Sequence, residues 1–105
     1  MITSGSGRYR VWLKTEQIGD DRLYILGGGE RPHIGGVVIW EPEKGGQTII
    51  LSTHKDHLVL EPLAEKACDK YKVTTVAVGG IHIENATQEE ITIIMKNCKE
   101  LMECI

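Results

Sequence analysis

The chain has 105 residues, which is enough for one domain with a single hydrophobic core. Hydrophobic residues make up 41% and charged residues 26%, proportions that exclude a disordered or collagen-like chain. The net charge of −3, with two Trp, three Tyr and no Phe, argues against a nucleic-acid-binding surface, which needs clustered cations and stacking platforms.

Targeting and membrane signals also bear on where the protein works. The first thirty residues do not combine a basic start with an apolar run, and no apolar stretch approaches the roughly eighteen residues that span a bilayer. Cys68, Cys98 and Cys104 lack CxxC spacing, which favours reduced thiols over a disulfide framework. We therefore expect a soluble, unprocessed, cytoplasmic protein without a membrane partner, with Cys68 and Cys98 packed in its core.

Alternating apolar and polar residues predict four strands in the first half of the chain. The first strand is expected over Arg8–Ile18, and the turn Gly19-Asp20-Asp21 leads into its hairpin partner, Arg22–Leu26. Val37–Glu41 and Thr48–Ser52 form a second pair around the turn-rich sequence PEKGG. We expect these four strands to form an antiparallel meander.

A helix and a fifth strand follow. Apolar residues recur at helical spacing in DHLVLEPLAEKACDKY, and Pro62 leaves two possible starts: near Leu60, or near Asp56 with a bend. Val73–Val78 is almost wholly apolar and β-branched, a pattern typical of a strand inside a sheet.

The last segment is predicted to be a second helix. Thr87-Gln88-Glu89-Glu90 is a capping box, in which the hydroxyl and the carboxylate each satisfy a free backbone amide. A continuous apolar stripe follows and is expected to pack in the core, formed by Ile91, Ile94, Met95, Cys98, Leu101, Met102 and Ile105.

The predicted fold class is α+β: a single domain over residues 1–105 in the order ββββαβα, with a mostly antiparallel five-stranded sheet and two helices packed on one face. In a meander the second and fourth strands point the same way, and a strand–helix–strand crossover makes the fifth parallel to the fourth. The segments GGGERPHIGG, STHKDH and GGIHIENAT should therefore leave at one edge. They carry all four histidines: His33, His54, His57 and His82.

Glycines in these segments suggest an anion site. Backbone amides of Gly27-Gly28-Gly29 and Gly79-Gly80 can form an anion-binding nest, and the second helix begins soon after the second run. Arg31 and Lys55 add positive charge, so a phosphate would suit this edge. Neither run is a Walker motif or a GxGxxG fingerprint, and ordinary turn glycines remain the alternative.

The histidines leave further alternatives open. His54, His57 and His82 suggest a zinc-type site, although a surface position is the favoured interpretation of His54 and His57. His33 and His82 fit either a ligand contact or a buried imidazole bonded to a backbone carbonyl. Catalysis has little support, because the chain lacks a Ser or Cys elbow motif and its acidic residues are not spaced as an acid–base pair.

The motifs GGGERPHIGG, HKDHLVLEPLAEKA and GGIHIENATQEEI, in this order, resemble the LpdD-like prenylated-flavin chaperones, the small D subunits associated with gallate and hydroxybenzoate decarboxylases. The resemblance covers the chain from about Gly27 onward. It implies a non-catalytic accessory protein that dimerises, binds prenylated flavin mononucleotide (FMN) as cargo and helps a UbiD-type decarboxylase acquire it. The binding residues that it implies are Gly28, Gly29, Arg31, Pro32, His33, His54, His57, Gly80, His82 and Asn85, and Lys55 joins them as a cation for the phosphate.

Two other functions are kept as alternatives. The first is a homodimeric interaction or assembly subunit without a small-molecule ligand, using a solvent-facing Trp12 and Trp40. The second is a metal-dependent hydrolase or lyase that uses His54, His57 and His82.

Overall fold

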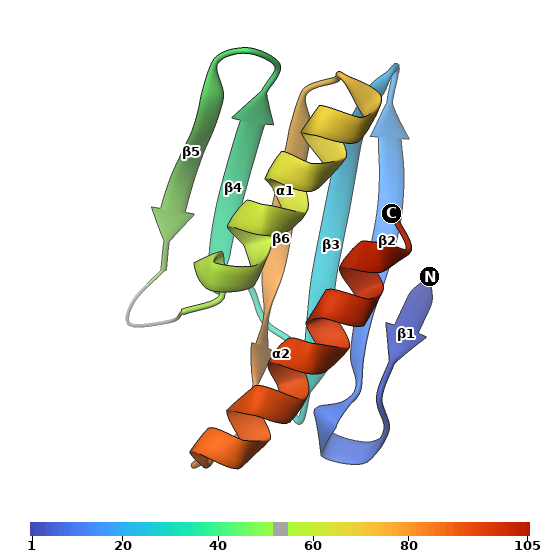
Figure 1. The fold of residues 1–105 in the computed structure, drawn as a ribbon. Coiled ribbons are helices and arrows are strands. Elements are labelled where there is room, and N and C mark those ends of the chain that lie inside the picture. Colours follow the sequence, from blue (N-terminus) through green and yellow to red (C-terminus); the bar gives the residue numbers. More distant parts are fainter. Residues whose placement is uncertain (52–54) are drawn as a thin grey trace.

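The computed structural model describes residues 1–51 and 55–105. One six-stranded mixed sheet forms a layer, and two helices cover one of its faces (Figure 1). The elements are β1 (Ile2–Ser4), the 3-10 turn η1 (Gly7–Tyr9), β2 (Val11–Ile18), β3 (Asp21–Gly29), β4 (Gly36–Glu41), β5 (Gly45–Ile50), α1 (His57–Tyr71), β6 (Thr75–His82) and α2 (Gln88–Glu103). The predicted α+β class, with two helices on one face, is confirmed.

The prediction of five strands is wrong by one. The short strand β1 pairs antiparallel with β2, with Ile2 opposite Leu13. The strand expected from Arg8 is β2, which begins only at Val11, because η1 occupies residues 7–9. Gly5 and Gly7 have φ angles of 81° and 59°, and these left-handed conformations turn the chain between β1 and β2.

The predicted meander is also wrong, because β6 inserts between β3 and β4. The strand order is β1-β2-β3-β6-β4-β5, and β6 pairs parallel with β3 and antiparallel with β4. Residues 76–78 of β6 are apolar, so a place between two strands buries more of their surface than an edge would. The expectation that this strand lies inside the sheet is confirmed.

The strand directions nevertheless make β3, β5 and β6 end at one edge, as expected. Since β6 is parallel to β3, while β4 is antiparallel to both β6 and β5, the strands β3, β5 and β6 all run the same way. The chain therefore leaves all three at the same edge of the sheet, the lower one in Figure 1.

Both glycine runs belong to strands and not to loops. β3 continues to Gly29 and β6 continues to His82, and the two remain paired throughout, with Gly27 opposite Gly80 and Gly29 opposite His82. The expected strand ends at Leu26 and Val78 are thus too early. Glycine weakens an isolated strand, but here neighbouring backbone and side chains approach too closely for a Cβ.

Both helices begin at positions that the sequence predicted. α1 begins at His57 and contains Pro62, which agrees with the earlier of the two possible starts. Thr87 caps α2: its hydroxyl accepts from the Glu90 amide at 3.2 Å, and the Glu90 carboxylate accepts from the Thr87 amide at 3.0 Å. The capping box is therefore confirmed. The amide and hydroxyl of Thr87 and the hydroxyl of Tyr9 together lower the pKa of Glu90.

The core lies between the sheet and the two helices. Leu13, Tyr24 and Leu26 from the sheet pack with Leu60 and Leu101 from the helices, all of them almost fully buried. Cys68 and Cys98 are buried free thiols, as expected, and burial raises the pKa of Cys98 to about 12. No helix in the described part of the chain is long and apolar enough to cross a membrane.

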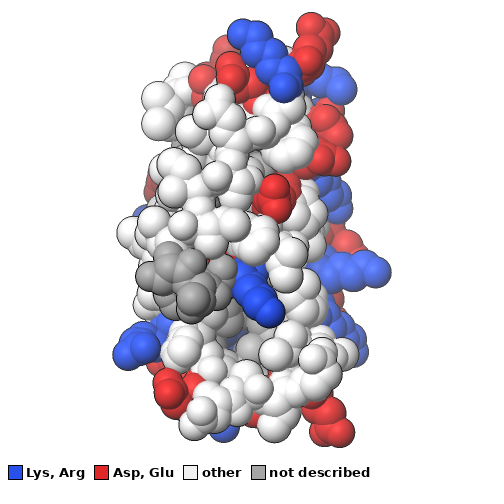
Figure 2. Space-filling view, turned by 90° about the vertical axis from the view of Figure 1, so that its left-hand side faces the viewer, with Lys and Arg blue, Asp and Glu red and all other residues white. Residues whose placement is uncertain are grey.

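The sheet face away from the helices, which we call the open face, is mostly apolar, although Lys14 and Glu16 of β2 and Gln47 of β5 also lie on it. Alternation along the strands directs to it Trp12, Leu23, Ile25, Val37, Ile39, Ile49, Val76 and Val78. Figure 2 views the molecule from the side of β5, and charged side chains gather mostly on the helix side, to the right. Trp12 and Trp40 are both half-buried, Trp12 on the open face and Trp40 against the core, so neither side chain faces solvent fully.

Candidate functional site

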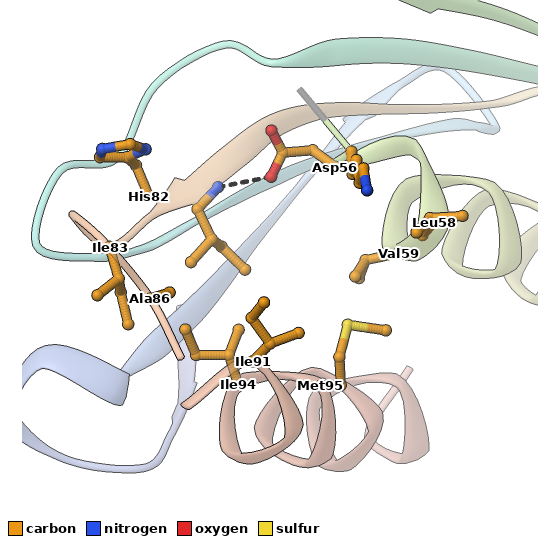
Figure 3. A pocket seen from close by; sticks show the side chains of 11 residues that line it. Asp56, Leu58, Val59, His82, Ile83, Ala86, Ile91, Ile94 and Met95 are labelled. Carbon is orange, nitrogen blue, oxygen red and sulfur yellow. Dashed lines mark hydrogen bonds between the residues drawn. The ribbon is translucent and has the colours of Figure 1, made fainter. Parts of the chain in front are cut away.

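The Asp56 carboxylate lies where β6 ends and α1 begins. One of its oxygens accepts a hydrogen bond from the Ile81 amide at 2.9 Å, the dashed line in Figure 3. The other lies 3.5 Å from Nε2 of His33, and the Asp56 side chain is only 10% exposed. Asp56 occupies the N-cap position of α1 without a side-chain cap bond. Its side chain therefore links the helix to β6 and to the His33 loop.

Two glycines leave room for this carboxylate. A Cβ on Gly35 would lie 1.9 Å from Oδ2 of Asp56. A Cβ on Gly80 would lie 2.8 Å from the same oxygen and 2.9 Å from Nε2 of His33. Gly80, which the resemblance implied as a binding residue, thus has a packing role beneath Asp56 and His33.

His33 and His82 lie side by side at this edge. Their rings meet edge to face, with centroids 6.1 Å apart. Nε2 of His82 lies 3.0 Å from a carboxylate oxygen of Glu84. This hydrogen bond is the main cause of a lowered pKa of Glu84, and the nearby charges of His82 and Arg31 contribute. Each imidazole therefore lies beside a carboxylate, His33 beside Asp56 and His82 beside Glu84, and both rings are partly accessible to solvent.

Among the glycine amides expected to form an anion nest, that of Gly29 is used within the sheet. The Gly29 amide donates to the Arg10 carbonyl at 2.9 Å, and the amides of Glu30 and Arg31 donate to the His82 carbonyl at 2.8 and 3.3 Å. At the start of α2, the capping box satisfies the amides of Thr87 and Glu90. The Gly29 amide is therefore already engaged by a backbone carbonyl.

Glu30 joins the loops that follow β3 and β6. Its carboxylate accepts from the Glu84 amide at 3.1 Å and lies 3.3 Å from the Arg8 guanidinium. These contacts hold Glu30 against the neighbouring loop.

The remaining predicted residues are spread around the same edge. Pro32 lies in the loop between β3 and β4 and lines a hollow of about 360 Å³ that reaches the open face. Lys55 is exposed just before α1, and Asn85 is exposed in the turn after β6 with φ 51°. His57 is the first residue of α1, and its buried Nδ1 has no hydrogen-bond partner in the described part of the chain. His54 lies outside the described residues.

Within residues 1–51 and 55–105, no three His, Cys, Asp or Glu side chains are grouped as metal ligands would be. The predicted set of His54, His57 and His82 includes one residue outside these ranges.

A cavity of about 320 Å³ opens beside Asp56, between α1, β6 and α2 (Figure 3). Its polar side chains are Lys55, Asp56 and His82. Its apolar wall consists of Leu58, Val59, Ile81, Ile83, Ala86, Ile91, Ile94 and Met95. Sequence reasoning missed this cavity and the part that Asp56 plays in it, because the apolar wall follows an ordinary core pattern and an Asp before a helix suggests a cap.

Comparisons with known proteins identify the family of the chain. The family model described as "Prenylated flavin chaperone LpdD-like domain" matches residues 5–105, which includes every element of the fold after β1. The chain is also similar to Protein LpdD of Lactiplantibacillus plantarum, with 25% identity over 95 residues that cover 86% of this chain and 70% of that protein.

Proposed function

This chain belongs to the LpdD-like prenylated flavin chaperone family, and from that premise we propose that it binds prenylated FMN as cargo and helps to supply a UbiD-type aromatic-acid decarboxylase. The match to the family over residues 5–105 is the observation that carries the proposal. In this role the protein has no turnover of its own.

The side chains at the shared edge fit such a ligand. Lys55 and Arg31 are exposed cations that can pair with a phosphate, and His33 and His82 can hydrogen-bond to polar atoms of a flavin ring. The apolar cavity beside them matches the usual composition of a ligand pocket, in which a few polar groups fix the orientation of a mostly buried ring system. The proposal therefore assigns polar contacts to the strand ends and apolar contacts to the cavity.

The first test is an anaerobic calorimetric titration of the purified protein with reduced prenylated FMN and, in parallel, with ordinary reduced FMN. We expect saturable binding that prefers the prenylated form. If the protein binds neither compound, the proposal fails, and an assembly subunit without a ligand becomes the better explanation of the fold.

We also propose that two copies associate through the open face. Contiguous apolar surface of this kind commonly marks an interaction site. Pairing two such faces also covers Pro32 and Ile34 in the loop after β3, because these residues line a hollow together with Trp12 and Val78 of the open face.

Ile25→Glu tests this association. Ile25 lies on the open face directly opposite Lys14 on β2, so the new carboxylate can pair with Lys14 within one monomer. In a dimer it would be buried, and we expect the dimer dissociation constant to rise by at least about tenfold. Sedimentation velocity measures this change. Thr92→Glu is the control, because it adds the same charge at an exposed position of α2, and it should leave association unchanged. Equal effects of the two variants would contradict the proposed interface.

A further inference from the structure

Part of the apolar stripe of α2 is left uncovered. The stripe has the spacing of a core-facing surface, and Ile94, Cys98 and Leu101 are indeed buried. Ile91 and Met95 are 43% and 41% exposed, contrary to the expectation that they pack in the core. Both line the cavity, and they face α1 across its opening (Figure 3). The stripe thus extends beyond the surface that the fold itself covers.

The facing helix adds to this uncovered surface. Leu58, in the first turn of α1, is 54% exposed and also lines the cavity. Between the helices the floor is apolar, with Ile81 and Ile83 contributed by β6 and the segment that follows it. An apolar floor with exposed apolar side chains around its opening is typical of a site that binds an apolar group.

The cavity is polar at the strand ends and apolar between the helices. Lys55, Asp56 and His82 contribute its polar side chains, and these residues belong to the edge where the proposed cargo makes its polar contacts. A prenylated flavin has a matching division, because the prenyl-derived part is hydrocarbon whereas the phosphate and much of the ring edge are polar. The group that fills the cavity should therefore be part of the same ligand that binds at the strand ends.

We infer that the cavity between α1 and α2 receives the prenyl-derived hydrocarbon part of the cargo and so lets the protein distinguish prenylated FMN from ordinary FMN. This inference rests on the proposed function. In this arrangement Leu58, Ile91 and Met95 close over the hydrocarbon part, while the phosphate remains near the exposed cations of the strand ends.

Two isoleucines of α2 provide a matched test. Ile91 lines the cavity and is 43% exposed, whereas Ile93 is 41% exposed and does not line it. Anaerobic titrations with reduced prenylated FMN and reduced FMN would compare the unaltered protein with Ile91→Gln and Ile93→Gln. We expect Ile91→Gln to weaken binding of the prenylated form by at least about tenfold, the lower end of what one group contributes in a hydrophobic pocket. Ordinary FMN should lose much less, and Ile93→Gln should bind both compounds as the unaltered protein does.

The outcomes separate this inference from the proposed function. If the unaltered protein prefers prenylated FMN and Ile91→Gln retains that preference, the inference fails while the proposed function stands. If the unaltered protein binds neither flavin, both fail. If Ile91→Gln changes only the sedimentation of the protein, a second copy covers the cavity and the inference is again overturned. Thermal unfolding monitors the fold, and Met95→Gln replaces Ile91→Gln if the latter does not fold.

Discussion

Gly79→Ala is expected to lower the free energy of unfolding by about 4 kcal/mol or more, a large part of the 5–15 kcal/mol that typically holds a domain together. Gly79 has φ 134°, a conformation that residues with a side chain rarely adopt. A Cβ at this position would also lie 1.8 Å from the Leu26 carbonyl oxygen. Leu26 is the register partner of Gly79 on β3, so relief of the clash would break the pairing of β3 with β6. Urea unfolding followed by circular dichroism measures the loss.

Gly19→Ala is the matched control, because it adds the same methyl group at a position with strain but without a clash. Gly19 lies between β2 and β3 with φ 61°, and a Cβ there would have no described atom within 4 Å. Its cost should be limited to the conformational penalty, about 1–2 kcal/mol. Similar losses for the two variants would show that backbone conformation alone, and not the contact with Leu26, requires glycine at position 79.

The glycine runs explain where sequence reasoning about the fold succeeded and where it stopped. Periodicity and capping located both helices and, with shifted bounds, the four longer strands of the first half, since these signals are local. The strand expected over Thr48–Ser52 instead runs over Gly45–Ile50, so it begins inside the predicted turn PEKGG, and Ser52 lies outside the described residues. The sequence-based prediction ended β3 at Leu26, because Gly27, Gly28 and Gly29 have no side chains that could show alternation. Only the pairing of these residues with β6 reveals that they are strand, and that pairing joins segments about fifty residues apart. The place of β6 between β3 and β4 is a tertiary choice of the same kind.

The candidate site was predictable to the same extent. Strand directions alone placed the segments containing His33 and His82 at one edge, and the structure brings the two rings together. The partner of His33 was not predictable, because Asp56 is distant in sequence and resembles a helix cap. The cavity was not predictable either, since Ile91 and Met95 follow the same helical spacing as the buried Ile94. Spacing identifies a face of a helix, but not how far the neighbouring elements cover it.

Asp56→Ala is expected to lower the free energy of unfolding by about 2–3 kcal/mol. The substitution removes the 2.9 Å hydrogen bond from the Ile81 amide, and bonds of this kind to a charged group contribute about 1.5–3 kcal/mol. It also leaves space at Gly35 and Gly80, whose backbones lie close around the carboxylate. Urea unfolding measures the loss of stability, and hydrogen exchange of the Ile81 amide should become faster than that of amides in the centre of β6.

Two variants separate this specific contact from a general effect of removing a charge on α1. Asp69→Ala removes the same side chain from an exposed position on the same helix and should change stability by less than about 0.5 kcal/mol. Asp56→Asn retains an oxygen that can accept from the Ile81 amide, so it should preserve more stability than Asp56→Ala and keep exchange at Ile81 slow. If Asp56→Ala were no more damaging than Asp69→Ala, the carboxylate would not hold α1 to β6. The edge where His33 and His82 meet would then depend on the strands alone.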